Sequence, residues 1–274
     1  MFLNCCVCQR GLVPEGDTVF REARALNEAL AGGVLTRCDV RVPAFATVDL
    51  TGQTVHGVVS RGKHLLLRAG ESTIHSHLKM EGSWHRYRHG TRWQRPAFQA
   101  RIVLETADWV AVGFELGLLE IVQTSAEDAV VGYLGPDLLG PGWASAAAAD
   151  AAHRLLRDTD VPVAVALAQQ RNLAGLGNVY VNELCFLRGL LPTRPMAEVA
   201  DTAALVALAR RLIFANVDRL ERTTTGNTRR GQQLWVYGRA GRPCRRCGTS
   251  IRRGSLGRTE LEQRNTFWCP RCQT

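Results

Sequence analysis

Lysine is almost absent from this sequence, since only Lys63 and Lys79 occur among 34 basic residues. Long uncharged apolar runs are missing as well, so no segment is predicted to cross a bilayer. Met1–Leu12 lack a basic leader and a small-residue cleavage site, which argues against a secretory signal. We therefore expect a soluble intracellular protein with only two side-chain amines for imine chemistry.

The net charge of +9 is concentrated at the end of the chain. Residues 229–274 contain eleven arginines and two acidic residues, whereas the preceding residues carry equal numbers of both signs. Such a basic segment neutralises a polyanion, which makes nucleic acid the expected partner. The alternative is a basic tail that only aids solubility, but the cysteines among these arginines argue against it.

Four of the nine cysteines form two C-x-x-C pairs that are predicted to hold one structural zinc ion: Cys244, Cys247, Cys269 and Cys272. Four thiolates leave no coordination position open for catalysis, and an intracellular setting disfavours disulfides. Between the pairs we expect a β-hairpin in which Thr249–Arg253 pairs with Thr266–Trp268, with Gly254 and Gly257 at the turn.

The other cysteines carry weaker signals. Cys38 and Cys185 stand alone in apolar contexts and are interpreted as buried small hydrophobic residues. Cys5, Cys6 and Cys8 could form a second metal or redox site, but they have no fourth ligand.

The periodicity of the sequence predicts a mixed α and β architecture. A helix that Asp17 could cap ends near Leu30, and a helical region begins after glycine–proline pairs at 135–142. Six short strands, indicating an antiparallel sandwich or barrel, are expected at Leu35–Val42, Thr54–Ser60, His64–Arg68, Ala100–Glu105, Val110–Phe114 and Leu118–Gln123. Helices are expected at Ser145–Arg157, Val163–Gln170, Asn178–Leu187 and Asp201–Arg222, followed by a mobile polar loop at Thr223–Gln233.

A tight reversal over Asn172–Gly177 joins two of these helices. Its glycines let the chain turn sharply and let backbone amides approach a ligand, and a helix N-terminus attracts phosphate. Asn178 is therefore either a phosphate-binding residue, an N-cap, or both.

Several dispersed motifs resemble one enzyme family. They are Pro14–Asp17 (PEGD), Arg61–Leu65 (RGKHL), Leu173–Tyr180 (LAGLGNVY), Val236–Arg239 (VYGR) and Cys269–Gln273 (CPRCQ). In this order they resemble the formamidopyrimidine-DNA glycosylase/endonuclease VIII family over about residues 13–274, and PEG and RGKHL are more similar to the endonuclease VIII branch.

The resemblance implies a multidomain α+β fold: a β-sandwich with an N-terminal helix, a helical domain with a helix–two-turns–helix motif, and a zinc β-hairpin. We place their bounds at 14–138, 139–238 and 239–274, after an extension at 1–13. It also implies a bifunctional DNA glycosylase and abasic-site lyase of base-excision repair. Oxidised pyrimidines are the expected substrate and β,δ-elimination the expected cleavage. We expect a monomer in the bacterial cytoplasm that acts on damaged DNA and needs no organic cofactor.

The resemblance assigns catalytic roles to three residues. Pro14 matches the nucleophile whose secondary amine attacks the sugar C1′ and forms an imine. Glu15 matches the acid/base residue that helps protonate the sugar oxygen and the departing base. Lys63 matches a lysine that holds a phosphate near the target nucleotide, although a solvated surface lysine is the alternative.

The resemblance also implies a DNA clamp and a wedge. Asn178 and Arg264 match phosphate-binding residues that act with Lys63 on the bent strand. His77–Gly82 matches the loop that fills the hole left by an extruded base, with Met80 as the inserted residue. The alternative for Met80 is a buried methionine on a strand.

The position of Pro14 departs from the family pattern. The family's proline is the mature N-terminus, whereas an attached Met1–Val13 would make this nitrogen a tertiary amide without a free lone pair. Either translation starts at Val13 from a GUG codon, as the arginine- and alanine-rich composition of a GC-rich genome favours, or the extension is real. We expect the first.

Two rival functions remain open from the sequence. A damaged-DNA or abasic-site binding protein without lyase activity would result if the extension blocked Pro14. A zinc-ribbon protein of the transcription type would explain the cysteines, but it gives Pro-Glu-Gly and the Lys63 turn no purpose.

Overall fold

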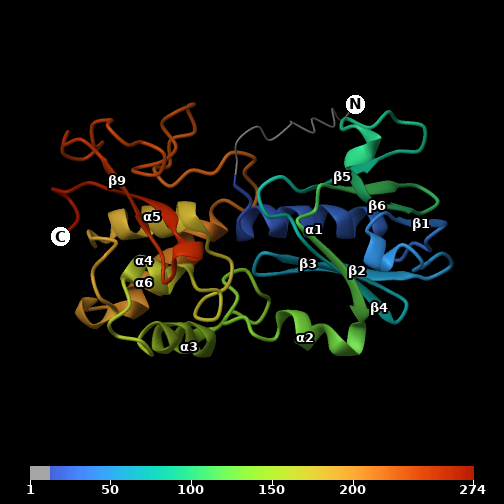
Figure 1. Ribbon diagram of the computed structural model, residues 1–274, viewed down its shortest axis with the longest axis horizontal. Coiled ribbons are helices and arrows are strands. Elements are labelled where there is room, and N and C mark those ends of the chain that lie inside the picture. The colour runs from blue at the N-terminus through green and yellow to red at the C-terminus, as the bar shows by residue number, and fades with distance from the viewer. Residues whose placement is uncertain (1–12) are drawn as a thin grey trace. The chain divides into compact units, whose positions relative to one another are not determined.

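The computed structural model describes residues 13–274 as two compact units (Figure 1). Of the described residues, the first contains Val13, Pro14 and Thr18–Tyr133, and the second contains Glu15–Asp17 and Leu134–Thr274. Strands and helices both contribute, which confirms the predicted α+β class. Residues 1–12 of the proposed extension, with Cys5, Cys6 and Cys8, lie outside the described residues. The predicted domain bounds stay predictions.

The first unit contains two four-stranded antiparallel sheets. One has the order β1-β6-β7-β5, with bounds Arg37–Val40, Ala100–Glu105, Val110–Phe114 and Ser83–Tyr87. The other has the order β2-β3-β4-β8, with bounds Val55–Arg61, His64–Ala69, Ser72–His77 and Leu118–Gln123. Helix α1 (Gly16–Leu30) supplies a third element, and α2 (Glu127–Val131) follows β8.

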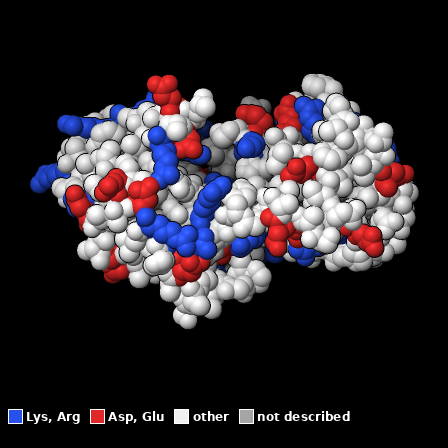
Figure 2. Space-filling view, turned by 60° about the horizontal axis from the view of Figure 1, so that its bottom comes forward, with Lys and Arg blue, Asp and Glu red and all other residues white. Residues whose placement is uncertain are grey.

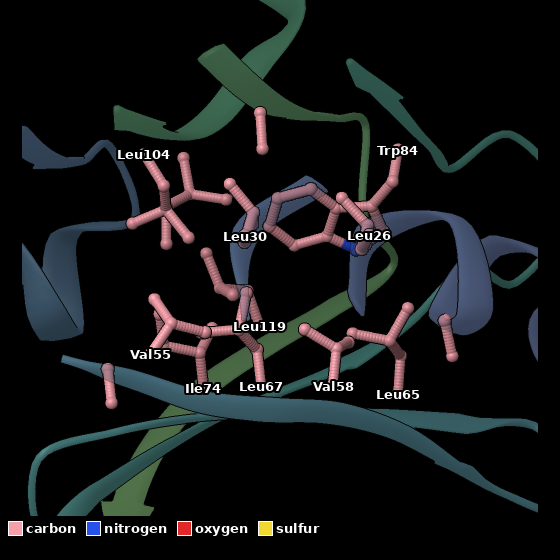
Figure 3. Close-up of a cluster of buried hydrophobic side chains, with 14 of the residues drawn as sticks. Leu26, Leu30, Val55, Val58, Leu65, Leu67, Ile74, Trp84, Leu104 and Leu119 are labelled. Atoms are coloured by element: carbon pink, nitrogen blue, oxygen red, sulfur yellow. The ribbon is translucent and has the colours of Figure 1, made fainter. Parts of the chain in front are cut away.

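The core of this unit lies between the sheets, where α1 inserts its apolar face (Figure 3). Leu26 and Leu30 from the helix meet Leu65 and Ile74 of one sheet and Leu104 of the other, and all five are buried. Each such side chain contributes about 1.5–3 kcal/mol through burial. The packing fixes the helix and gives the strands one inward face each.

The structure corrects the strand predictions at two places. The predicted bounds of β6, β7 and β8 are correct, whereas β4 and β5 were missed. Four consecutive residues of β4, Thr73–Ser76, are buried, and three of them are polar, so the strand lacks the apolar alternation that marks a half-buried strand. Hydrogen bonds to neighbouring side chains allow these polar groups to be buried.

The second unit contains helices and a β-hairpin. The helices are α3 (Ser145–Leu155), α4 (Val163–Ala168), α5 (Asn178–Leu187) and α6 (Thr202–Phe214), and β9 (Arg252–Leu256) pairs with β10 (Arg264–Trp268). Among the described residues, no helix has the length and apolar character needed to span a membrane. Cys185 is buried within α5, as expected, whereas Cys38 of the first unit is only partly buried where it packs against that unit's core.

Helix α6 is shorter than predicted because a side chain ends it. Asp201 caps its start by accepting from the amide of Ala204 at 2.7 Å. Beyond its end, the Asn216 amide donates to the carbonyls of Leu212 at 2.8 Å and Thr223 at 3.0 Å. These bonds replace the next helical turn, so the helix ends at Phe214. The apolar periodicity of the sequence continues past this end, which is why the predicted helix was too long.

The predicted mobile loop at Thr223–Gln233 is partly buried. Thr223 and Thr224 are less than a tenth exposed, and the Thr224 hydroxyl donates to the buried carboxylate of Glu183. Glu183 also accepts from the amides of three consecutive residues, Trp235–Tyr237, at 2.8–2.9 Å. The polarity of this segment reflects internal hydrogen bonds, so its first residues were wrongly interpreted as mobile.

The hairpin is shifted relative to the prediction. Gly254 pairs with Thr266 within the strands, and residues 257–263 make the connection. The ring of Trp268 covers Gly254, where a Cβ atom would lie 3.2 Å from two ring carbons. This glycine therefore serves close packing and not the turn.

Candidate functional site

Glu15 is anchored on the N-terminus of α5. Its carboxylate accepts hydrogen bonds from the backbone amides of Gly177 at 2.9 Å, Val179 at 2.8 Å and Tyr180 at 3.4 Å. The side chain is fully buried. A carboxylate is the expected partner of a helix N-terminus, because the unpaired amides and the dipole both favour negative charge there.

Glycines make room for this arrangement. Gly16 donates its amide to the carbonyl of Gly175 at 2.9 Å, and a Cβ atom on Gly16 would lie 2.8 Å from that oxygen. A Cβ atom on Gly177 would lie 2.4 Å from the carboxylate carbon of Glu15. The sequence predicted that the glycines of the Asn172–Gly177 turn leave backbone amides open to a phosphate. This is corrected, because the Glu15 carboxylate already accepts from three amides at the start of α5.

Asp17 takes part in a buried ion pair and does not cap α1, which already begins at Gly16. Its two carboxylate oxygens accept from Nε and Nη2 of Arg222, the former at 2.8 Å. The hydroxyl of Tyr180 donates to the same carboxylate at 2.9 Å, and the Arg222 guanidinium lies over the Tyr180 ring. Sequence reasoning missed Arg222, because nothing in its local pattern indicates a partner at Asp17.

Asn178 is the first residue of α5, and Gly177 is the N-cap, so the N-cap interpretation of Asn178 is wrong. Its side-chain amide donates to the carbonyl of Asn265 at 2.8 Å, one residue from Arg264 on β10. The Asn182 side chain accepts from the amide of Phe267 at 2.6 Å. Asn178 and the exposed Arg264 are thus fixed on adjoining elements.

Four cysteine sulfurs form a cluster that could hold one metal ion: Cys244, Cys247, Cys269 and Cys272. All four Sγ atoms lie within 4.8 Å of one another, with 3.5 Å from Cys247 to Cys269 and 3.9 Å from Cys244 to Cys272. A tetrahedral ZnS₄ centre with bonds of about 2.3 Å places its sulfurs about 3.8 Å apart. The donor set therefore fits a closed, structural site.

Lys63 lies in the tight turn that joins β2 to β3. Arg61 pairs with His64 across this hairpin, so Gly62 and Lys63 are its two loop residues, and Gly62 has a φ of 60°. A glycine with positive φ at the first loop position is typical of a type II′ hairpin. Lys63 is therefore on a strand-to-strand turn, as predicted.

A chain of hydrogen-bonded side chains crosses the sheet behind this turn. His64 Nδ1 lies 2.7 Å from His75 Nε2, and His75 Nδ1 lies 2.6 Å from the Glu120 carboxylate. Tyr133 Oη lies 3.1 Å from His64 Nε2. Burial and the neighbouring His77 lower the pKa of His64 to about 3, so its ring is neutral at neutral pH. Sequence reasoning missed this chain because its members lie on separate strands.

Met80 lies in the turn between β4 and β5 and is 61% exposed. The preceding Lys79 has a φ of 55°, a left-handed conformation that is rare for a residue with a side chain. Met80 is not the buried strand residue of the alternative interpretation. Pro14 lies just before α1, and in this sequence its nitrogen is acylated by Val13.

The predicted residues divide between the units. Pro14, Lys63 and Met80 belong to the first unit, whereas Glu15, Asn178, Arg264 and the four cysteines belong to the second. The second unit also contains residues 229–274 and their excess of arginine. Figure 2 shows Lys and Arg side chains gathered on one face of this unit, with acidic side chains among them.

Comparison with known proteins places this arrangement in a family. The family model of the formamidopyrimidine-DNA glycosylase N-terminal domain matches residues 13–115. The DNA-(apurinic or apyrimidinic site) lyase Nei2 of Mycolicibacterium smegmatis is 55% identical over 262 residues, covering 96% of this chain and 99% of the relative. Endonuclease 8 2 of Mycobacterium tuberculosis is 51% identical, covering 95% of this chain and all of the relative.

Solved structures share the fold. Lactococcus lactis Fpg in complex with DNA containing an abasic site matches with a TM-score of 0.77 at 22% identity, covering 95% of this chain and all of that chain. The chain belongs to the formamidopyrimidine-DNA glycosylase family. Relatives named endonuclease 8 or Nei2 are more than half identical, whereas the Acidiphilium cryptum formamidopyrimidine-DNA glycosylase is 32% identical.

Proposed function

We propose that this protein is a base-excision repair enzyme that removes oxidised bases, pyrimidines above all, and cleaves the resulting abasic strand. The observation that carries the proposal is the placement of Glu15. This carboxylate adjoins Pro14 in the chain and is oriented by three backbone amides of α5. The relatives named as abasic-site lyase and endonuclease 8 support the same activity.

Pro14 is the nucleophile in this proposal, and it acts only as the first residue of the chain. Its unprotonated amine adds to the sugar C1′, the base departs with a proton, and opening of the sugar ring leaves an iminium on the proline nitrogen. Glu15 delivers the proton to the sugar oxygen or the base. Loss of a C2′ proton then expels the 3′ phosphate, and a second elimination expels the 5′ phosphate.

The remaining residues hold the damaged strand. Lys63, Asn178 and Arg264 bind phosphates around the target nucleotide, and Met80 enters the space that the extruded base leaves. The bonds from Asn178 and Asn182 to β10 support this role, because they fix the two phosphate-binding elements of the second unit together. We infer that the protein acts as a monomer on DNA in the bacterial cytoplasm.

The metal in the cysteine cluster is proposed to be zinc. Its four ligands would leave no open position, so its contribution would be to fold the hairpin that presents Arg264. No step of base removal or strand cleavage passes through it. The two chemical steps need no organic cofactor.

Borohydride trapping on abasic-site DNA tests the proposal. The chain is prepared so that Pro14 follows only an initiator methionine that is removed, and the crosslinked residue is mapped by mass spectrometry. We expect a covalent adduct on Pro14. An adduct on Lys63 or Lys79 would move the imine to a side chain and overturn the assignment of Pro14.

A second function follows from the acylation of Pro14 by Val13 in the sequence as written. In that form the protein would bind abasic or damaged DNA without cutting it. Retained binding with no trapped adduct, in the chain that starts at Pro14 as well, would favour this function. Binding together with trapping in the short chain alone would favour the enzyme.

A further inference from the structure

We propose that Arg95 is a positioning residue for the loop that carries Met80. This inference rests on the proposed role of Met80 in filling the space of an extruded base. Arg95 lies in the segment between β5 and β6 and is mostly buried, with a side-chain exposure of 21%. It contacts no proposed DNA-binding residue directly. It bonds to the loop between β4 and β5, which carries Met80, and to the loop between β7 and β8, which begins at Glu115.

The guanidinium of Arg95 joins three segments. Nη1 donates to the carbonyl of Glu81 at 3.0 Å and to the hydroxyl of Ser83 at 3.1 Å, one and three residues after Met80. Nη2 forms an ion pair with the Glu115 carboxylate, and Nε donates to the side chain of Gln99 at 2.9 Å. Only the planar fork of arginine supplies donors in these directions at once.

Backbone conformation at the same junction is strained. Among the described residues, Lys79 with a φ of 55° and Glu115 with a φ of 44° are the non-glycine residues in the left-handed region. They lie on the two loops that Arg95 joins. Such conformations cost roughly 1–3 kcal/mol each and persist where surrounding contacts enforce them, often at functional positions.

The two loops are in close contact. A Cβ atom on Gly117 would lie 2.2 Å from Cγ of Lys79, and one on Gly82 would lie 3.1 Å from the carbonyl oxygen of Glu115. Glycine at both positions lets the loops approach, and the Arg95–Glu115 ion pair then holds them. Met80 is 61% exposed at the tip of this fixed loop.

A wedge that enters the DNA stack must keep its position when the base leaves, because flipping costs a few kcal/mol that the inserted residue offsets. A loop released from Glu115 would place Met80 less precisely, and a displacement of about 1 Å reduces turnover by up to about 100-fold. A single-stranded substrate has no stack to fill. Arg95 should therefore matter for duplex DNA and not for the single strand.

The test compares Arg95→Met and Arg95→Lys with the parent chain on one damaged oligonucleotide, single-stranded and in duplex. We expect Arg95→Met to lower duplex turnover by about 10-fold to 100-fold and to change single-strand turnover by less than about 2-fold. Arg95→Lys keeps the charge but not the fork, so its loss should be intermediate. 2-Aminopurine beside the lesion should report reduced unstacking in step with the duplex loss.

Arg37→Met is the matched control, since Arg37 forms a more exposed ion pair with Glu105 on the same sheet at 3.0 Å. This substitution should leave the turnover of both substrates unchanged. In a double-mutant cycle, Met80→Ala and Arg95→Met should be non-additive on duplex DNA.

Two results would overturn the inference. Equal loss on both substrates would assign Arg95 to general folding. A duplex-specific loss in Met80→Ala that is absent in Arg95→Met would leave the wedge intact and remove the role of Arg95. If Met80→Ala has no effect while Pro14 still traps, the wedge itself fails but the proposed chemistry does not.

Discussion

Arg222 forms a bidentate ion pair with Asp17, a residue 205 positions earlier in the chain. Burial opposes the charge of Arg222, but Glu15 and Asp17 outweigh it and raise the pKa of the guanidinium above its ordinary value. Burial and the same carboxylate of Asp17 raise the pKa of Tyr180, so its hydroxyl remains a hydrogen-bond donor. The Asp following Pro-Glu-Gly is therefore structural.

Asp17→Asn should strongly destabilise the protein, because it leaves the buried Arg222 without its counter-charge. We expect a loss of about 3–5 kcal/mol in the free energy of unfolding, measured by urea denaturation. The control is Asp158→Asn, which breaks a solvent-exposed ion pair with Arg258 and should cost less than about 1 kcal/mol. Equal effects of the two substitutions would contradict the assignment.

Glu15→Gln should separate the two chemical steps. Removing the acid/base group should slow base excision by about 100-fold to 10,000-fold, because the departing base needs a proton. A preformed abasic site has no base to release, so borohydride trapping there should survive in a chain that starts at Pro14. Loss of trapping together with excision would show that Glu15 is needed for imine formation itself.

The histidine chain should have a defined proton arrangement. The Glu120 carboxylate can only accept, so with neutral rings His75 donates from Nδ1 and accepts at Nε2, and His64 then donates from Nδ1. The Tyr133 hydroxyl donates to His64 Nε2. Nitrogen NMR at neutral pH should show Nδ1–H tautomers for both rings, and an Nε2–H signal from His64 would refute this arrangement.

Two histidines, His64 and His77, predict a loss of stability in acid. Burial is the main cause of pKa values of about 3 for His64 and about 4 for His77, against an ordinary value of 6.5. Because the folded state binds these protons less tightly than the unfolded state, their stabilising contribution is complete above pH 6.5 and is lost as pH falls toward 4. Thermal melts of His64→Gln should show a weaker decline over that range.

Metal removal should weaken DNA binding, because it disrupts the contact that positions Asn178. Chelation should unfold the hairpin, remove the Asn265 carbonyl that Asn178 contacts, and weaken DNA binding. Elemental analysis should find one zinc ion per chain. Undiminished DNA binding after chelation would contradict this coupling.

Arg264→Ala should reduce the salt dependence of DNA binding by about one phosphate contact, whereas Arg271→Ala serves as the control.

Local patterns predicted the parts of the fold that depend on local chemistry. The bounds of β6, β7, β8 and α5 were correct, since short apolar runs define the strands and a glycine turn defines the start of the helix. β4 was missed because both of its faces are buried and polar residues such as His75 and Ser76 interrupt the apolar pattern. No local sequence pattern predicts that Asn216 ends α6, because its hydrogen-bond partner Thr223 lies beyond the helix.

For the candidate site, the sequence predicted the cysteine cluster and the turn that carries Lys63, whereas the roles of Pro14, Glu15 and Lys63 stay predictions. The spacing of the cysteines indicated the cluster, and the glycine before Lys63 indicated the turn. That Glu15 accepts from the backbone amides at the start of α5 could not be read from either motif, because more than 160 residues separate the two segments. Long-range pairing of this kind needs a structure.

The missing side chain at residue 177 has a consequence for how the sequence can change. A methyl group there would occupy the volume of the Glu15 carboxylate, so the two positions share one small space and cannot vary independently. An alanine at 177 would displace the carboxylate and, in the proposed mechanism, would slow base release without contacting DNA or the proline. The proposed activity therefore depends on the absence of a side chain at residue 177 as much as on any reactive group.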